Sequence, residues 1–499
     1  MSSIYRRGAV SLVRAGRSGN GVWAVKLKDL TLIENANGAQ LTSFRPLGVV
    51  TAFRFVLIAG FLLTIAANQP GHMSFDSVVQ LHEGRTHVRD TWAPAIYSAI
   101  LGGFDRVVPG TGLYLVASVA LVFGSLLALR KLRPTMAWTG PLAAILVVFT
   151  PDFLIGQGAV WKDVLFANLA VAAFVLLALV AKTWVNPRVP WVSLLGIVLL
   201  LAIAAQVRQN GLIATAFAAL VLAWTARSRG LRSVVLWGSA LFLAVVVLSQ
   251  VLGQLSLPSG SPRDTGFSTG LRVLQRYDIV GVAARDTRFD LAVIGKANPE
   301  IARDIRTRGV PLLSPARWDS LHGDPVFLAA FKSVPAKVIN HQWWVMISEH
   351  PVAYLKHRLE VFRWVFLTPM IDSCMPIFVG VEGPAQKIVD LKMSASVDAN
   401  DQRLYNYGTW FLDTPVYSHL SYALICVGTA VVLLLRREPQ DMAIVGLMFA
   451  ALGFLASFFV ISISCDYRYL YFVDLAALVG LVYLAIDPPL AALGLGRPK

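Results

Sequence analysis

Residues 163–182 read DVLFANLAVAAFVLLALVAK, and this stretch carries no charged side chain between Asp163 and Lys182. A helix needs roughly 20 mostly apolar residues to cross a hydrocarbon core about 30 Å thick. The stretch therefore predicts a membrane-spanning helix. The same pattern recurs along the chain, and we predict about ten spans in all. The predicted spans are about 47–66, 111–130, 136–150, 163–182, 191–206, 211–226, 233–252, 416–435, 442–463 and 469–486.

The composition of the whole chain agrees with this prediction. Its mean hydropathy is +0.62, and 56% of its 499 residues are hydrophobic while only 15% are charged. These values exclude an ordinary soluble domain. No pattern of alternating ten-residue strands runs through the sequence, so a membrane barrel is not expected. We predict an all-α polytopic membrane protein with a seven-span bundle at 47–252 and three further spans at 416–486.

The formal net charge is +15. In a soluble protein this charge would suggest a nucleic-acid partner, but here the basic residues gather before the first span and in alternate connections. Cytoplasmic loops of membrane proteins are enriched in Lys and Arg, so these connections and both termini are expected in the cytoplasm. The residues concerned are Arg6, Arg7, Arg14, Arg17, Lys26, Lys28, Arg45, Arg130, Lys131, Arg133, Lys182, Arg188, Arg227, Arg229, Arg232, Arg436 and Arg437.

Two long polar segments, 67–110 and 253–415, then face the other side of the membrane. We predict juxtamembrane helices in the first and a small, mainly helical outer domain in the second. Within it, 353–370 interleaves basic and aromatic residues, which is typical of a helix lying on a membrane surface. The alternative, a further span, would bury several charges. Residues 1–46 are expected to be a basic cytoplasmic arm without the apolar core of a cleavable signal, and 487–499 a cytoplasmic tail.

The cysteines and histidines show no metal-binding pattern. Cys374, Cys426 and Cys465 lack the spacing of a metal site, and no HExxH motif occurs, so no metal or other cofactor is predicted. Cys374 and Cys465 both fall on the predicted outer side. The sequence leaves two alternatives open for them, a disulfide and a pair of free thiols.

Short polar clusters lie at the predicted outer ends of several spans. They are 74–77 (SFDS), 90–98 (DTWAPAIYS), 151–152 (PD), 161–163 (WKD), 208–211 (RQNG) and 465–469 (CDYRY). Together they supply carboxylates, cations and aromatic rings at one membrane face. Because they come from separate connections, their convergence on one face predicts an active or binding site there.

Each cluster also has a structural interpretation. Asp76 could cap a helix that begins at Ser77, and Lys162 could pair with its neighbour Asp163. Arg208 could reach lipid head groups. Asp466 could cap the last span, with Tyr467 in an interfacial aromatic belt.

An outward first loop with an Asp soon after the first span resembles the glycosyltransferase C superfamily. In bacterial members similar to protein mannosyltransferases and aminoarabinose transferases, this loop often continues to a Trp-His-Pro-Pro-like patch. Here the patch reads Trp92-Ala93-Pro94-Ala95, without the His and the second Pro. The resemblance covers about 47–486. It implies a glycosyltransferase of the bacterial inner membrane with its active site facing the periplasm. Its implied partners are a polyprenyl-phosphate-linked sugar, the lipid bilayer and a glycan, lipid or protein acceptor, with no nucleic acid.

Roles can be assigned to the clustered residues on this basis. Asp76 is the predicted catalytic base, because no basic residue stands beside it at 72–75 to neutralise it. Cations near the membrane face would stabilise the phosphate leaving group, and tryptophans would stack on the sugar. The predicted substrate-binding residues are Lys162, Arg208, Arg468, Trp92, Trp161, Asp163, Asn210, Asp466 and Tyr467.

Two other functions remain open at the level of the sequence. One is an O-antigen ligase- or polymerase-type enzyme, which uses diphosphate-linked glycans. The other is a transporter or flippase, which predicts inverted repeats and ionisable residues near the bilayer midplane.

Overall fold

The structure is a computed structural model that describes residues 48–184, 189–258 and 266–488, together with the backbone of three short strands. The strands β1 (Trp23–Leu27), β2 (Leu30–Glu34) and β3 (Gln40–Thr42) pair in this order, each antiparallel to the next. The sequence analysis did not predict this sheet. Several predicted features lie outside the described residues: the rest of the basic arm, Arg188 and the end of the tail. The chain divides into two units, Met1–Ala52 and Phe53–Lys499.

The predicted spans are helices in the structure. Eight helices of the described residues are long and apolar enough to cross a membrane, and two shorter apolar helices accompany them. All of them coincide with predicted spans, which confirms an all-α polytopic membrane fold. They are α1 (Val49–Asn68), α4 (Gly112–Leu129), α5 (Thr139–Val148), α7 (Lys162–Thr183), α8 (Trp191–Val207), α9 (Leu212–Ala226), α10 (Leu231–Leu255), α21 (His419–Arg436), α22 (Asp441–Ile461) and α23 (Tyr471–Ile486).

Helix α7 is the centre of the bundle. It packs against α4, α8, α22 and α23, and Phe166 stacks on Phe454 of α22 with ring centroids 5.0 Å apart. Its apolar side chains point in every direction because neighbours surround it. Helices α8 and α10, in contrast, leave large apolar side chains such as Val192 and Leu236 exposed. Such an exposed apolar surface suits a helix that faces lipid.

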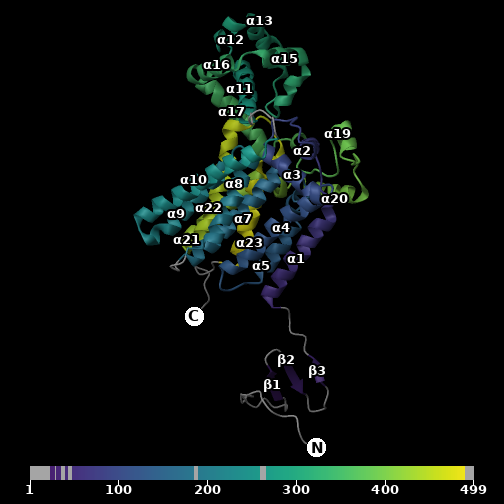
Figure 1. The fold of residues 1–499 in the computed structure, drawn as a ribbon, viewed down its shortest axis with the longest axis vertical. Helices are drawn as coiled ribbons and strands as arrows, with labels where there is room; N and C mark the ends of the chain where they lie inside the picture. The colour runs from purple at the N-terminus through teal and green to yellow at the C-terminus, as the bar shows by residue number, and fades with distance from the viewer. Residues whose placement is uncertain are drawn as a thin grey trace, which may run out of the picture. The chain divides into compact units, whose positions relative to one another are not determined.

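The helices of the first long polar segment, α2 (Phe75–Thr86) and α3 (Ala95–Val107), lie at one end of the bundle (Figure 1). They follow α1, and α6 (Pro151–Gly156) precedes α7. Helices α2 and α3 cross in close contact at Gly84 and Gly102, where a Cβ on either residue would run into the backbone of the other helix. This crossing fixes the last turns of α2 against α3.

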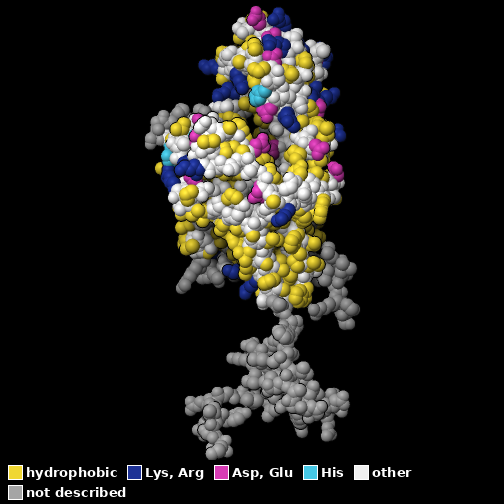
Figure 2. Space-filling view, turned by 90° about the vertical axis from the view of Figure 1, so that its right-hand side faces the viewer, with side chains coloured by type: hydrophobic (Ala, Val, Ile, Leu, Met, Phe, Trp, Pro, Cys, Tyr) yellow, Lys and Arg dark blue, Asp and Glu magenta, His cyan; other side chains and the backbone are white. Residues whose placement is uncertain are grey.

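A helical domain stands at the same end (Figure 1). We use this name for residues 266–367, whose buried side chains form a core of their own. Figure 2 shows charged side chains gathered on this domain and hydrophobic ones covering the body of the bundle. Its elements are α11 (Gly266–Arg285), α12 (Ala292–Ala297), α13 (Pro299–Asp304), η3 (Ile305–Gly309), α14 (Val310–Leu312), η4 (Trp318–Gly323), α15 (Pro325–Ser333), α16 (Ala336–Glu349) and α17 (Pro351–Leu367).

The rest of the predicted outer segment packs mostly on the bundle, and α18 also contacts the helical domain through Ser373 and Cys374. Helix α19 contacts α2, and α20 contacts α6. The short helices concerned are α18 (Ile371–Cys374), α19 (Ala385–Asp390) and α20 (Ala399–Thr409), and the remaining short helices are η1 (Arg130–Leu132), η2 (Arg227–Arg229), η5 (Pro415–Tyr417) and η6 (Tyr467–Leu470).

Helix α17 connects the two cores. Val361 belongs to the core of the helical domain, whereas Val365 belongs to the core of the bundle. Arg358 is fully buried and donates to Asp278 over 2.8 Å. Arg358 therefore ties α17 to α11. That this helix lies on a membrane surface stays a prediction.

Candidate active site

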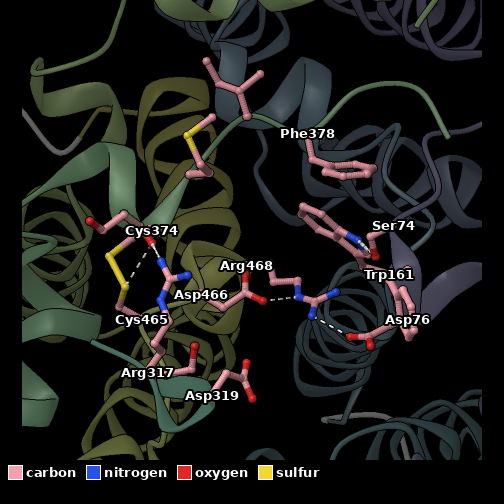
Figure 3. A pocket seen from close by; sticks show the side chains of 15 residues that line it. Ser74, Asp76, Trp161, Arg317, Asp319, Cys374, Phe378, Cys465, Asp466 and Arg468 are labelled. Carbon is pink, nitrogen blue, oxygen red and sulfur yellow. Dashed lines mark hydrogen bonds and ion pairs between the residues drawn. A yellow bond between two sulfur atoms is a disulfide. The ribbon is translucent and has the colours of Figure 1, made fainter. Parts of the chain in front are cut away.

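A cavity of about 330 Å³ opens where the helical domain meets the bundle. Figure 3 shows side chains from distant parts of the chain pointing toward it. The lining residues are Ser74, Phe75, Asp76, Trp161, Arg317, Asp319, Ser373, Cys374, Met375, Ile377, Phe378, Ser464, Cys465, Asp466 and Arg468. The clusters at 74–77, 161–163 and 465–469 thus share one cavity.

Backbone hydrogen bonds hold the start of α2 in this place. The segment at His72 and Met73 pairs with two other segments. His72 forms a parallel bridge with Ala159, and Met73 forms a parallel bridge with Val381. The Ser77 hydroxyl donates to the Val160 carbonyl over 2.5 Å. These contacts bring the beginning of α2, the beginning of α7 and the segment before α19 to one wall of the cavity.

Asp76 lies in the first turn of α2, which begins at Phe75, so it does not cap a helix beginning at Ser77. Its carboxylate pairs with Arg468 at 2.7 Å, and Arg468 also donates to Asp466 over 2.8 Å. The expectation that Asp76 has no cationic partner is therefore wrong. The neighbouring residues in the sequence are indeed not basic, but folding supplies a cation from η6.

The two carboxylates beside Arg468 have opposite pKa shifts. Burial tends to raise the pKa of Asp76, but the positive charges of Arg468 and Lys162 outweigh it and leave this pKa below its ordinary value. Burial raises the pKa of Asp466 above its ordinary value, because the attraction of Arg468 does not fully compensate for it. Asp76 is therefore the weaker base of the two in the unliganded cavity.

A second ion pair lies directly behind the cavity. Asp163 is buried and accepts a hydrogen bond from Arg208, and its other oxygen lies 3.9 Å from Nε of Arg468. The Arg208 guanidinium also lies 5.4 Å from the ring centroid of Tyr469. Arg208 thus pairs with a buried carboxylate of the protein, and it does not line the cavity.

Lys162 is a third cation near these ion pairs, and it is not part of any of them. It is half-buried at the start of α7 and acts electrostatically on both Asp76 and Asp163. Among the described residues, none forms an ion pair or a hydrogen bond with its ammonium group. Lys162 does not line the cavity itself, but its neighbour Trp161 does. An unpaired ammonium so close to a cavity is suited to an anionic ligand.

Aromatic side chains form one side of the cavity. The rings of Trp161 and Phe378 have centroids 5.7 Å apart, and the Arg468 guanidinium lies 5.1 Å from the Trp161 centroid. The Trp161 indole donates to the Ser74 hydroxyl over 3.0 Å, which fixes the orientation of the ring. The sequence identified Trp161 but not Phe378.

Three predicted site residues lie elsewhere. Trp92 is nearly half exposed, and a Cβ on Gly270 at the start of α11 would lie 3.3 Å from its ring. Asn210 donates to Ser457 over 2.9 Å. Tyr467 is buried and stacks on His419 with centroids 4.1 Å apart. The structure brings none of the three to the cavity wall.

Nothing in the sequence indicated that the helical domain contributes residues to the cavity. Arg317 and Asp319 line the cavity, and Arg317 donates to the Ser373 carbonyl over 3.0 Å. Neither residue stands at the end of a span. Only the packing of the domain on the bundle brings them here.

Cys374 and Cys465 form a disulfide at the edge of the cavity, with Cα atoms 5.2 Å apart (Figure 3). Of the two alternatives that the sequence left open, the structure contains the bonded one. Within the described residues, no group of three or more His, Cys, Asp and Glu side chains is arranged to hold a metal ion.

Comparisons with known proteins give one distant likeness. No family model and no curated protein matches the sequence. Among solved structures, the chain is similar to the oligosaccharyltransferase AglB of the archaeon Archaeoglobus fulgidus, solved in complex with an inhibitory peptide and a dolichol-phosphate, with a TM-score of 0.41 and 11% identity. The likeness covers 90% of this chain and 52% of that one, so this chain spans about half the length of its structural neighbour.

Proposed function

We propose that this chain is an integral-membrane glycosyltransferase. It would move a sugar from a polyprenyl-phosphate carrier to a cell-envelope acceptor, which is a lipid, a polysaccharide or a protein. The observation that carries this proposal is the cavity at the ends of the membrane spans in which Arg468 pairs with Asp76 and Asp466. The unpaired Lys162, next to the lining residue Trp161, acts electrostatically on Asp76.

The position of the cavity suits a donor of this kind. A polyprenyl-phosphate sugar has an apolar tail, an anionic phosphate and a polar sugar. A cavity at the ends of α1, α7 and α22 lets the tail stay among lipids while the phosphate meets Lys162 and Arg468. Charge that develops on the leaving phosphate would be stabilised by these fixed cations, which is usually a large part of catalysis in a partly enclosed site.

The reaction needs one base. The acceptor oxygen attacks the anomeric carbon, and its proton passes to Asp76. The bond between the anomeric carbon and the phosphate oxygen breaks on the opposite face, and its electrons remain on the polyprenyl phosphate. A bound phosphate that competes for Arg468 would weaken the ion pair with Asp76. The pKa of Asp76 would then rise and make it a better base.

Trp161 and Phe378 would contact the sugar, and Arg208 would act through Asp163, which it holds beside Arg468. We propose no metal or other cofactor for this reaction.

The proposed orientation places the cavity on the periplasmic face of a bacterial inner membrane, with both termini in the cytoplasm. The Lys and Arg residues of the opposite connections support it. The disulfide between Cys374 and Cys465 supports it as well, because disulfides persist in oxidising compartments such as the periplasm.

Binding of undecaprenyl phosphate to the purified full-length protein tests the donor site. We expect Lys162→Ala to weaken this binding by about tenfold or more, since a charge-assisted contact contributes about 1.5–3 kcal/mol. Lys182→Ala is the matched control, because Lys182 stands near the other end of the same helix. Equal affinities of the two variants would contradict a phosphate site at Lys162. Tighter binding of undecaprenyl diphosphate than of the monophosphate would favour the diphosphate-dependent alternative.

A further inference from the structure

The segment that connects α22 to α23 carries two of the charged residues of the cavity. Residues 462–468, which we call the connecting segment, include Asp466 and Arg468. Ser462–Asp466 form no helix, and a short 3-10 helix, η6, begins only at Tyr467. An irregular connection between two helices has few restraints of its own, so something else must fix the place of Arg468.

The helical domain supplies these restraints through its backbone. Arg317 and Ser464 form an antiparallel bridge. The Trp318 amide donates to the Ile463 carbonyl over 2.7 Å, and the Cys465 amide donates to the Ala316 carbonyl over 2.7 Å. The edge at 316–318 therefore pairs with the connecting segment as one strand pairs with another.

A covalent bond and a buried charge reinforce this pairing. The disulfide joins Cys465, the residue before Asp466, to Cys374. At the other end of the segment, Arg358 of α17 donates to the Ser462 carbonyl. Arg358 in turn donates to Asp278, which also accepts a hydrogen bond from the Trp343 indole over 2.9 Å. These side chains are buried in the core of the helical domain, so the connecting segment is anchored to that core.

The anchored segment then reaches across the cavity to the bundle. Arg468 must lie between Asp76 of α2 and Asp163 of α7 to contact both. A shift of about 1 Å in this guanidinium would break the hydrogen bond to Asp76, because such bonds weaken steeply beyond about 3.2 Å. The last of these contacts is at Cys465, three residues before Arg468, which is close enough to transmit such a shift.

We propose that the helical domain is a positioning element of the site. Through the edge at 316–318 and Arg358, it holds the connecting segment so that Arg468 and Asp466 face the cavity. The disulfide adds a bond from this segment to Cys374 of α18, which packs beside that edge. The residues concerned are positioning residues and not catalytic ones. The part of this inference that concerns phosphate rests on the proposed function, whereas the part that concerns the segment does not.

Removal of the disulfide tests the inference in the full-length protein. In Cys374→Ser/Cys465→Ser, we expect faster hydrogen exchange at 463–470, with unchanged exchange in α7 as evidence that the bundle is folded. We also expect affinity for undecaprenyl phosphate to fall by about tenfold, the loss of one charge-assisted contact. Cys426→Ala is the matched control, because Cys426 is a free buried cysteine of α21. Arg358→Lys tests the second restraint in the same assays.

The outcomes separate this inference from the proposed function. Unchanged exchange at 463–470 in both altered proteins would overturn the inference. Faster exchange with unchanged affinity would also overturn it, because the segment would then be loosened without effect on the phosphate. If the unaltered protein does not bind undecaprenyl phosphate, the proposed function fails. The exchange at 463–470 alone then decides whether the helical domain holds the segment.

Discussion

At the scale of single residues, Arg468 determines the chemistry of the cavity. Its guanidinium contacts Asp76 and Asp466 and lies close to Asp163. One cation therefore sets the basicity of two candidate bases. The partners of Arg468 are far apart along the chain, since Asp76 precedes it by 392 residues. The sequence marked both residues as candidates but gave no indication that they pair.

The pH dependence of kcat/KM would distinguish the two carboxylates. An ordinary Asp has a pKa of about 3.9. Because the pKa of Asp76 is lowered, Asp76 stays ionised above about pH 4, and activity that depends on it alone should not fall until the pH drops below that value. Because the pKa of Asp466 is raised, a base at Asp466 would produce an acid limb above about pH 4. If the pH profile of kcat/KM has such an acid limb and the limb disappears in Asp466→Asn, the base is Asp466.

At the scale of elements, the crossing with α3 packs the helix that carries Asp76 tightly against its neighbour. We expect Gly102→Ala to destabilise the protein by about 1–3 kcal/mol, because the added methyl group would run into the Gly84 backbone. Its neighbour provides a matched control, since a Cβ on Gly103 would meet nothing within 4 Å. The melting temperatures of the two variants in detergent provide the comparison. If both melt at the temperature of the unaltered protein, the crossing does not restrain α2.

At the scale of the whole molecule, the membrane spans could be predicted from the sequence. The residues that make up the site could be predicted only in part. An apolar run of about 20 residues is a local property, so each span coincided with a helix. The clusters at 74–77, 161–163 and 465–469 could be found because they stand at span ends. Arg317 and Phe378 could not, because their place depends on how 266–415 packs. Arg208 and Asn210 stand at a span end as well, yet their side chains turn to Asp163 and Ser457.

The membrane topology can be measured directly. With Glu300→Cys in the helical domain and Lys131→Cys in η1, we expect a membrane-impermeant thiol reagent to label the first from the periplasm and the second only after the membrane is opened. The physical reason is the excess of Lys and Arg on the side of Lys131. The reverse pattern of labelling would place the cavity in the cytoplasm and contradict the proposed orientation.

The most direct test of the central claim is the release of the carrier. The purified protein is incubated with lipid-linked sugars and acceptors extracted from its own membranes, and free polyprenyl phosphate is measured by mass spectrometry. We predict release by the unaltered protein and a fall of roughly 10²–10⁴-fold in Asp76→Asn, the usual effect of losing one acid–base group. A well-folded Asp76→Asn protein that releases carrier at the unaltered rate would remove Asp76 as the base. No release by the unaltered protein would contradict glycosyl transfer from a polyprenyl phosphate.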